Sequence, residues 1–215
     1  MPHLMKTILL AATLTAQAAA AGPVGFGDWR QHWFARFADV DFTYSPKALD
    51  VQANGAVSIT YKLLDQSDWD ARAAQWQWSV DQTVPATDLR LKGGDDRNLA
   101  LYFAFLPKAE AERVKGGRNL RRLLKNPNGR VLVYVWGGDH GRGAVLASPY
   151  LGARGKTVVL RPSGTGGHAE RVDLAADYRR AFGTDPGALV ALALSSDSDD
   201  TNTVARGQIT DLVLN

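Results

Sequence analysis

The stretch QWQWSV, residues 75–80, decides the fold class, because its polar and apolar side chains alternate without a break. The two tryptophans and the valine fall on one face, while the glutamines and the serine fall on the other. A period of two residues is typical of a β-strand with one buried and one solvated face. Aromatic side chains in this pattern more often form a core than a ligand platform. We therefore expect Trp76 and Trp78 to be buried.

The same alternation continues through the chain. NLALYFAFL (98–106) places two leucines and two phenylalanines on one face, whereas RVLVYVW (130–136) is apolar on both faces, which predicts a central strand covered on both sides. Asn54-Gly55 is a hairpin signal between two further strands. The other predicted strands are VDFTYS (40–45), ALDVQA (48–53), AVSITYKL (56–63), KTVVLRP (156–162), ALVALALS (188–195) and QITDLVL (208–214).

About nine short strands in one chain favour a mainly β fold, an antiparallel β-sandwich or barrel. Two short helical insertions interrupt the strands. The first is expected over 108–125, broken by Gly116-Gly117, and the second runs from the N-cap Asp173 to Phe182, before Gly183.

The N-terminus MPHLMKTILLAATLTAQAAAAG resembles a secretory signal peptide, residues 1–21, cleaved near Ala21-Gly22. Its apolar run is too short and too rich in alanine for a membrane-spanning helix, and no later stretch predicts a transmembrane segment. We therefore expect one domain, 22–215, in a periplasmic or secreted protein. The chain has no cysteine, which excludes disulfides and makes zinc improbable.

The formal charge of +3 is small, and nucleic acid is not an expected partner. Basic residues nevertheless gather between 108 and 130, where eight lysines and arginines meet two glutamates. Such a region can contact an anionic envelope component or polysaccharide, although most charge runs are only solvated helix faces.

A glycine-rich loop, GGDHGRG (137–143), follows the strand 130–136 and carries Asp139, His140 and Arg142. Loops at strand ends often hold binding residues, so these three are binding candidates beside the alternative of a mobile turn. Serine-nucleophile and Walker-type phosphate motifs are absent from the sequence.

The stretch SSDSDDTNT (195–203) concentrates aspartates after an apolar run. The spacing excludes an EF-hand, but an irregular structural calcium site would use Asp197, Asp199, Asp200 and Asp211; the alternative is a solvated turn. Asp211 shares its strand face with apolar neighbours, so it needs either a bulge that turns it outward or a partner such as Arg161, Arg206 or a cation.

Six segments in order resemble a bacterial family of proteins of unknown function, DUF3047, from about Trp29 to the C-terminus. They are the W-x-W strand (Trp76, Trp78), Asp95-Asp96 before the next strand, L-x-Y-x-W (Leu132, Tyr134, Trp136), V-x-x-R-x-S-G (Val158, Arg161, Ser163, Gly164), the helix DYRRAFG (177–183) and D-x-D-x-T (Asp197, Asp199, Thr201) with Asp211 in the final strand. The chain departs from the family pattern at Asp200 and at His168-Ala169. The resemblance implies an exported domain similar to jelly-roll, galactose-binding or carbohydrate-binding modules, and it implies no activity.

Three functions remain open. The first is a non-catalytic envelope module that binds glycan or an anionic surface component, with Tyr134 and Trp136 as exposed stacking platforms and Arg161 as a further contact. The second is a glycan hydrolase that uses aspartates such as Asp95-Asp96 and Asp211. The third is an envelope scaffold or assembly partner.

Overall fold

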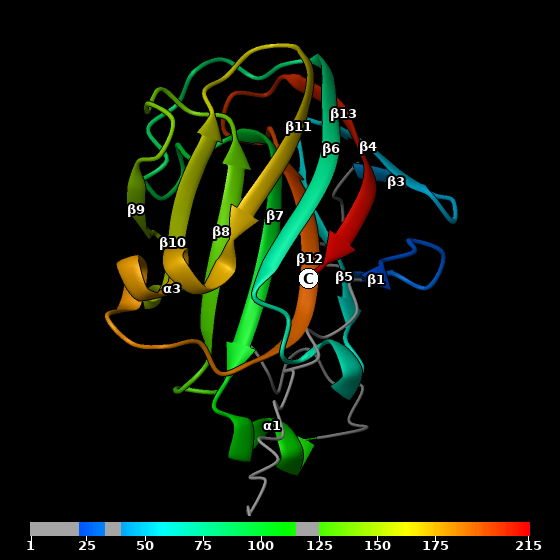
Figure 1. Ribbon diagram of the computed structural model, residues 1–215. Helices are drawn as coiled ribbons and strands as arrows, with labels where there is room; N and C mark the ends of the chain where they lie inside the picture. Colours follow the sequence, from blue (N-terminus) through cyan, green and yellow to red (C-terminus); the bar gives the residue numbers. More distant parts are fainter. Residues whose placement is uncertain (1–21, 33–39, 115–124) are drawn as a thin grey trace, which may run out of the picture.

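The computed structural model describes residues 22–32, 40–114 and 125–215. Two β-sheets pack face to face, so the chain folds as the predicted β-sandwich of the jelly-roll type, with helices at its periphery (Figure 1). No helix within these ranges is long and apolar enough to cross a membrane. The predicted signal peptide, residues 1–21, lies outside the described residues.

The first sheet has six strands in the order β11-β6-β13-β4-β3, and β1 also pairs with β13. All of its pairs are antiparallel. Its strands are β1 (Gly22–Pro23), β3 (Val40–Tyr44), β4 (Ala48–Asn54), β6 (Ala73–Gln82), β11 (Gly166–Asp173) and β13 (Val204–Leu214).

The second sheet has seven strands in the order β2-β5-β12-β7-β8-β10-β9. One pair departs from the expected antiparallel arrangement, because β8 and β10 run parallel. The strands are β2 (Arg30–His32), β5 (Val57–Leu63), β7 (Arg97–Leu106), β8 (Arg130–Trp136), β9 (Val145–Ser148), β10 (Gly152–Arg161) and β12 (Ala188–Asp197). Four of the thirteen strands, β1, β2, β9 and β11, were not predicted from the sequence.

The last two strands of the chain occupy central positions. In the seven-stranded sheet β12 lies between β5 and β7, and in the six-stranded sheet β13 lies between β4 and β6. Neither sheet is continuous without the C-terminal segment that carries both strands.

The core between the sheets contains the aromatic rows that the alternation predicts. Trp76 and Trp78 are each 2% exposed. Their rings lie 5.8 Å from the ring of Tyr134 and 5.6 Å from that of Trp136, respectively, on the facing sheet. Burial of these large rings is the main hydrophobic contribution to the fold.

Strand β8 is central and covered on both faces, as predicted. Leu132, Tyr134 and Trp136 point into the core between the sheets. Val133 and Val135 belong to a second apolar cluster on the outer face, under Leu89. The predicted strand faces of β7 are confirmed as well, since its leucines and phenylalanines enter the central core.

The hairpin predicted at Asn54-Gly55 is wrong. Gly55 turns the chain with a positive φ of 57°, as the pattern requires. However, β4 belongs to the six-stranded sheet and β5 to the seven-stranded sheet, so the turn joins the two layers. The strands on either side of the turn are apolar at alternate positions. This pattern is the same whether the two strands pair in one sheet or lie in two sheets that pack face to face.

The second predicted helix is confirmed as α3 (Leu174–Phe182). The Asp173 side chain caps it by accepting a hydrogen bond from the Ala176 N–H, and Gly183 ends it with a φ of 75°. The first insertion begins as α1 (Lys108–Val114), and a short 3-10 helix, Gln66–Asp68, lies elsewhere. Residues 115–124, which hold the rest of the predicted insertion and Gly116-Gly117, lie outside the described residues.

Candidate functional site

A groove with a volume of about 450 Å³ runs along the outer face of the seven-stranded sheet. Its floor is formed by small side chains on neighbouring strands, because the register of β12 and β7 places Ala191 opposite Ala104. Where neighbouring side chains are this small, the sheet leaves space above its backbone. The volume lies within the range of small-molecule sites in proteins, about 300–1,000 Å³.

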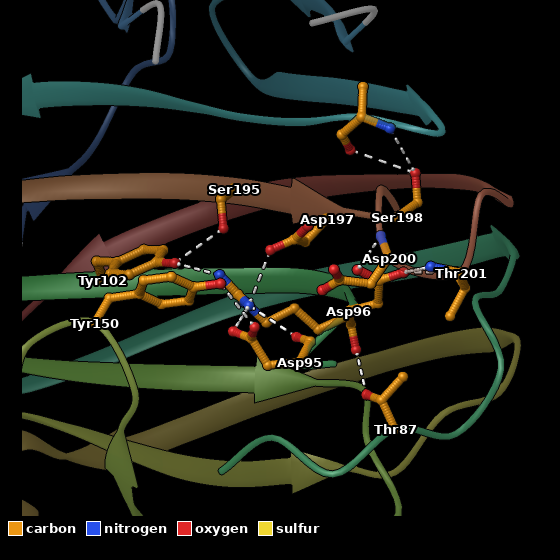
Figure 2. Close-up of polar contacts among 12 residues, drawn as sticks. Thr87, Asp95, Asp96, Tyr102, Tyr150, Ser195, Asp197, Ser198, Asp200 and Thr201 are labelled. Atoms are coloured by element: carbon orange, nitrogen blue, oxygen red, sulfur yellow. Dashed lines mark hydrogen bonds and ion pairs between the residues drawn. The ribbon is translucent and has the colours of Figure 1, made fainter. Parts of the chain in front are cut away.

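Arg97, whose side chain is 12% exposed, closes one end of the groove. The register places Arg97 of β7 opposite Asp197 of β12, and Asp95 precedes β7. The Arg97 Nη1 atom lies 2.8 Å from Asp95 Oδ2 and 3.1 Å from Asp197 Oδ2. We call these three residues the Arg97 centre. Figure 2 shows the two carboxyl groups converging, Asp197 from the end of β12 and Asp95 from the segment just before β7.

Two tyrosines extend the Arg97 centre into the groove. Tyr102 accepts a hydrogen bond from Arg97 Nη2 at 3.0 Å, and its hydroxyl lies 3.0 Å from Ser195 Oγ. Tyr150, in the turn between β9 and β10, donates to Asp95 Oδ1 at 3.0 Å (Figure 2). The ring of Tyr150 is nevertheless 55% exposed. Burial of its hydroxyl, together with the charge of Asp95, raises the pKa of Tyr150 to about 12.

The loop 198–203, which we call the acidic loop, lies against Asp96 at the same end. One Asp96 oxygen accepts hydrogen bonds from the Thr201 backbone N–H at 2.7 Å and from its hydroxyl at 2.5 Å. Thr87 donates to the Asp96 carbonyl oxygen at 2.6 Å. Asp96 is fully buried, so it fixes the acidic loop to the start of β7 (Figure 2).

The electrostatics of this end are dominated by negative charge. Burial raises the pKa of Asp197 to about 8; Arg97 opposes this rise, and the neighbouring Asp199 carboxyl adds to it. Burial and the charges of Asp199 and Asp96 likewise raise the pKa of Asp200. Asp197 and Asp200 therefore resist ionisation.

The predicted calcium ligands divide into two groups. Asp197, Asp199 and Asp200 lie together at the end of the groove, and Asp197 is the last residue of β12. Asp211 is not part of this group. It lies on the exposed side of β13, where its φ of 52° interrupts the register with β6, and Gln77 donates to it at 3.0 Å. The bulge expected as one solution for Asp211 is confirmed.

The stacking role predicted for Tyr134 and Trp136 is wrong. Their side chains are 0% and 1% exposed and point into the core between the sheets. The Tyr134 hydroxyl donates to Asp177 of α3 at 2.7 Å, and burial and this carboxylate raise its pKa. Since β8 is apolar on both faces, the sequence did not indicate which face is open, and both faces are covered.

Two of the other binding candidates form a structural contact. Arg142 Nη2 and Arg161 Nε donate to the two oxygens of Glu170, at 2.9 Å and 2.7 Å. We call this arrangement the Glu170 clasp. Glu170 is buried and belongs to β11, whereas Arg161 belongs to β10, so the clasp joins the two sheets. Arg161 therefore binds Glu170 and not Asp211.

Asp139 and His140 lie at a different contact. Their side chains are 2.8 Å apart, and the second ring nitrogen of His140 lies 3.4 Å from Asp88. Asp88, however, is held by both the backbone and the guanidinium of Arg90. The hydrogen bonds from Arg90 lower the pKa of Asp88. Asp88 is therefore largely satisfied within its own loop, whereas His140 Nδ1 is buried without a hydrogen bond among the described residues.

Several site residues were missed from the sequence. Asp95 and Asp96 were noted only as possible hydrolase acids and as part of the family resemblance, and Arg97, Tyr102 and Tyr150 were not singled out. One available signal was the small-residue alternation Ala100, Tyr102, Ala104 on the outer face of β7. A tyrosine between two alanines on the outer face of a strand indicates a depression in that face with one polar side chain in it.

Comparison with curated proteins finds no match. Among solved structures, the xyloglucanase domain of NopAA, an effector from Sinorhizobium fredii in complex with cellobiose, is 5% identical, with a TM-score of 0.46 over 91% of this chain and 98% of that chain. A loop-swap mutant of the Neocallimastix patriciarum xylanase Xyn11A is 12% identical, with a TM-score of 0.45 over 91% and 99%. Endoglucanase 3 of Trichoderma harzianum is 10% identical, with a TM-score of 0.34 over 82% and 83%.

These scores are too low to transfer any property from those enzymes to this chain. The match to a sequence family is more extensive, since it covers residues 28–213 and therefore nearly all of both sheets. It includes the tryptophans of the core, the Arg97 centre and the acidic loop. The chain thus belongs to the family described as "Protein of unknown function (DUF3047)".

Proposed function

We propose that this protein is a non-catalytic binding module that holds a glycan segment in the groove of the seven-stranded sheet. The observation that carries this proposal is Tyr150, whose ring is exposed while its hydroxyl is fixed to Asp95. It is the only exposed aromatic side chain within the described ranges. Lys92 Nζ lies 5.6 Å from the centroid of this ring, and the part of the ring that stays exposed at the wall of the groove is suited to stacking on the apolar face of a sugar. Tyr150 replaces the buried Tyr134 and Trp136 in that role.

The charge of the groove favours a neutral glycan over an anionic envelope component. Four aspartates line its closed end, namely Asp95, Asp197, Asp199 and Asp200, against the single guanidinium of Arg97. Carboxylates accept hydrogen bonds from sugar hydroxyls, whereas they repel phosphate or carboxylate groups of a ligand. The described parts of the basic region 108–130, residues 108–114 and 125–130, do not line this groove.

Binding of neutral polysaccharides tests this proposal. We expect retention of the protein by xylan or mixed-linkage β-glucan in affinity electrophoresis at low salt, and weaker retention by lipopolysaccharide. Tyr150→Ala should weaken binding by about tenfold, whereas Tyr150→Phe should preserve it because the ring remains. Retention of Tyr150→Ala equal to that of the wild type, or no retention of the wild type by any neutral polysaccharide, would contradict the proposal.

A glycan hydrolase is the second candidate, because the structure brings several carboxyl groups to one groove, as that function requires. Asp95 and Asp197, however, both bind the same guanidinium nitrogen of Arg97. A carboxylate committed to a buried arginine is poorly placed to transfer a proton to a sugar oxygen. We therefore favour binding, and release of reducing ends from these polysaccharides that disappears in Asp197→Asn would reverse the preference.

Export to the periplasm or the medium is part of the proposal. Gly22, the first residue after the predicted cleavage site, already pairs with Leu214 of β13. We expect mature protein from a native host to begin at Gly22, which N-terminal sequencing of the periplasmic fraction determines. Protein that still begins at residue 1 and is found only in the cytoplasm would contradict export. A single stoichiometric protein partner in a pull-down would instead favour the scaffold alternative.

A further inference from the structure

Three carboxylates at the closed end of the groove lie within reach of a single cation. Asp96, Asp199 and Asp200 each offer an oxygen, and these oxygens lie within 4.8 Å of one another. Ligands on opposite sides of a calcium ion are about 4.6–5.2 Å apart, since each Ca–O distance is about 2.3–2.6 Å. The separations of the three oxygens are therefore within those that ligands of one Ca²⁺ ion have.

A fourth oxygen at the same place is buried and has no hydrogen-bond partner. The side chain of Asp197 is 6% exposed, and its Oδ2 atom binds Arg97. Its Oδ1 atom is buried without a donor. The Asp197 carboxyl lines the same end of the groove as the Asp199 carboxyl, so the orphaned oxygen belongs to a side chain beside the acidic loop. An unpaired buried acceptor is costly, and a cation between the two carboxyl groups removes that cost.

The acidic loop holds these groups in place before any ion binds. Asp96 accepts hydrogen bonds from Thr201, and more weakly from the Asp200 backbone N–H at 3.3 Å. A carboxylate has about four acceptor positions, so these contacts leave Asp96 able to coordinate a metal. The loop therefore needs little reorganisation on binding, which lowers the entropic cost.

We propose that a Ca²⁺ ion binds at the acidic loop, with Asp96, Asp197, Asp199 and Asp200 as its ligands. All four donors are oxygens, which suits a hard cation and does not favour zinc or copper. The site differs from the one predicted from the sequence, because Asp96 takes the place of Asp211. This inference concerns the metal alone and does not depend on the proposed glycan ligand.

Calcium titration of the full chain, freed of metal with EDTA, tests the site. We expect calcium to raise Tm and to compete with a chromophoric chelator, with a dissociation constant of about 10⁻⁴–10⁻³ M because two of the ligands are exposed. Asp199→Asn and Asp200→Asn should each weaken binding by about tenfold or more, since each removes one charged ligand. Both residues are exposed, so these variants are expected to fold, and circular dichroism verifies this.

Asp211→Asn is the matched control, because Asp211 is another exposed aspartate that lies outside the cluster. We expect it to bind calcium with the affinity of the wild type. The proposal is overturned if calcium does not raise the Tm of the wild type, or if Asp211→Asn loses binding as strongly as Asp199→Asn. An equal response to magnesium would overturn the assignment to calcium, since magnesium requires shorter and more regular coordination.

Discussion

The Glu170 clasp and the Arg97 centre are built from the same kinds of groups in opposite proportions. In the clasp, two arginines bind one carboxylate. Burial alone would raise the pKa of Glu170, but the hydrogen bonds from Arg142 and Arg161 outweigh burial, so the pKa of Glu170 is lowered. In the centre, one arginine faces two aspartates, and the pKa of Asp197 is raised to about 8. The clasp is therefore electrostatically complete, whereas the centre still favours added positive charge. A cation or a hydroxyl-rich ligand interacts most favourably with a buried ion pair that carries excess negative charge.

The largest expected effect is the loss of Arg97. Arg97→Leu leaves Asp95 and Asp197 buried without their cation, which we expect to lower the free energy of unfolding by about 3–5 kcal/mol. Urea denaturation at neutral pH measures it. Arg206→Leu is the control, because Arg206 is an exposed arginine that contacts Gln52. A cost for Arg97→Leu no larger than that of the control would show that the centre does not depend on its cation.

Removing the carboxylate of the clasp should cost less. Glu170→Gln keeps the shape but leaves two arginines facing a neutral amide, and Arg142 can turn to solvent because its side chain is half exposed. We expect a loss of about 1–3 kcal/mol in the free energy of unfolding. Glu112→Gln, at an exposed glutamate that accepts a hydrogen bond from Gln66, is the matched substitution and should be nearly neutral. Equal stabilities for the two variants would contradict a structural role for the clasp.

The pH dependence of stability sharpens the same comparison. The pKa of Glu170 is lowered in the folded protein, from about 4.3 in the unfolded chain. Its ionised form therefore stabilises the fold above the unfolded pKa, and this contribution is lost as the pH falls through the folded pKa. We expect the stability difference between the wild type and Glu170→Gln to shrink steadily as urea denaturations move from pH 7 into this acidic range. A difference that stays constant with pH would argue that packing, not charge, holds the clasp.

The smallest expected effect comes from the acidic loop without metal. Asp199→Asn removes one of several like charges beside Asp96 and Asp200. In EDTA we expect its Tm to equal or slightly exceed that of the wild type, because repulsion between the carboxylates is reduced. A clear drop in Tm would mean that Asp199 stabilises the loop through contacts of its own. This result would distinguish the acidic loop, where carboxyl groups are in excess, from the Glu170 clasp, where the carboxylate is essential.

Much of the fold was predictable because strand alternation is a local property. The faces of β6, β7 and β8 follow from residues two apart, and the helix α3 follows from its cap at Asp173 and its stop at Gly183. The weak strands were missed. For example, β11 begins with two glycines and alternates exposed charges with only two buried side chains, so it lacks an apolar run.

Sheet membership was not predictable, because it depends on partners far away in the sequence. The Asn54-Gly55 turn is locally the same whether its strands pair with each other or enter different sheets. The candidate site depends on this non-local information too. Arg97 and Asp197 are neighbours only through the pairing of β7 with β12, and their contact cannot be deduced from either segment alone. The acidic turn was recognisable, but Asp96, to which the turn is hydrogen-bonded, lies just before a strand that is distant in the sequence.

The central positions of β12 and β13 have a consequence for biosynthesis. Strands β4, β5, β6 and β7 are synthesised before residues 188–214. Until those last residues are added, each sheet has a gap in its middle. Nascent chains therefore cannot complete either layer during translation, and many long-range pairings must close at the end, which makes folding slow. Both sheets therefore become complete only once residues 188–214 are available, whatever the order in which the other strands pair.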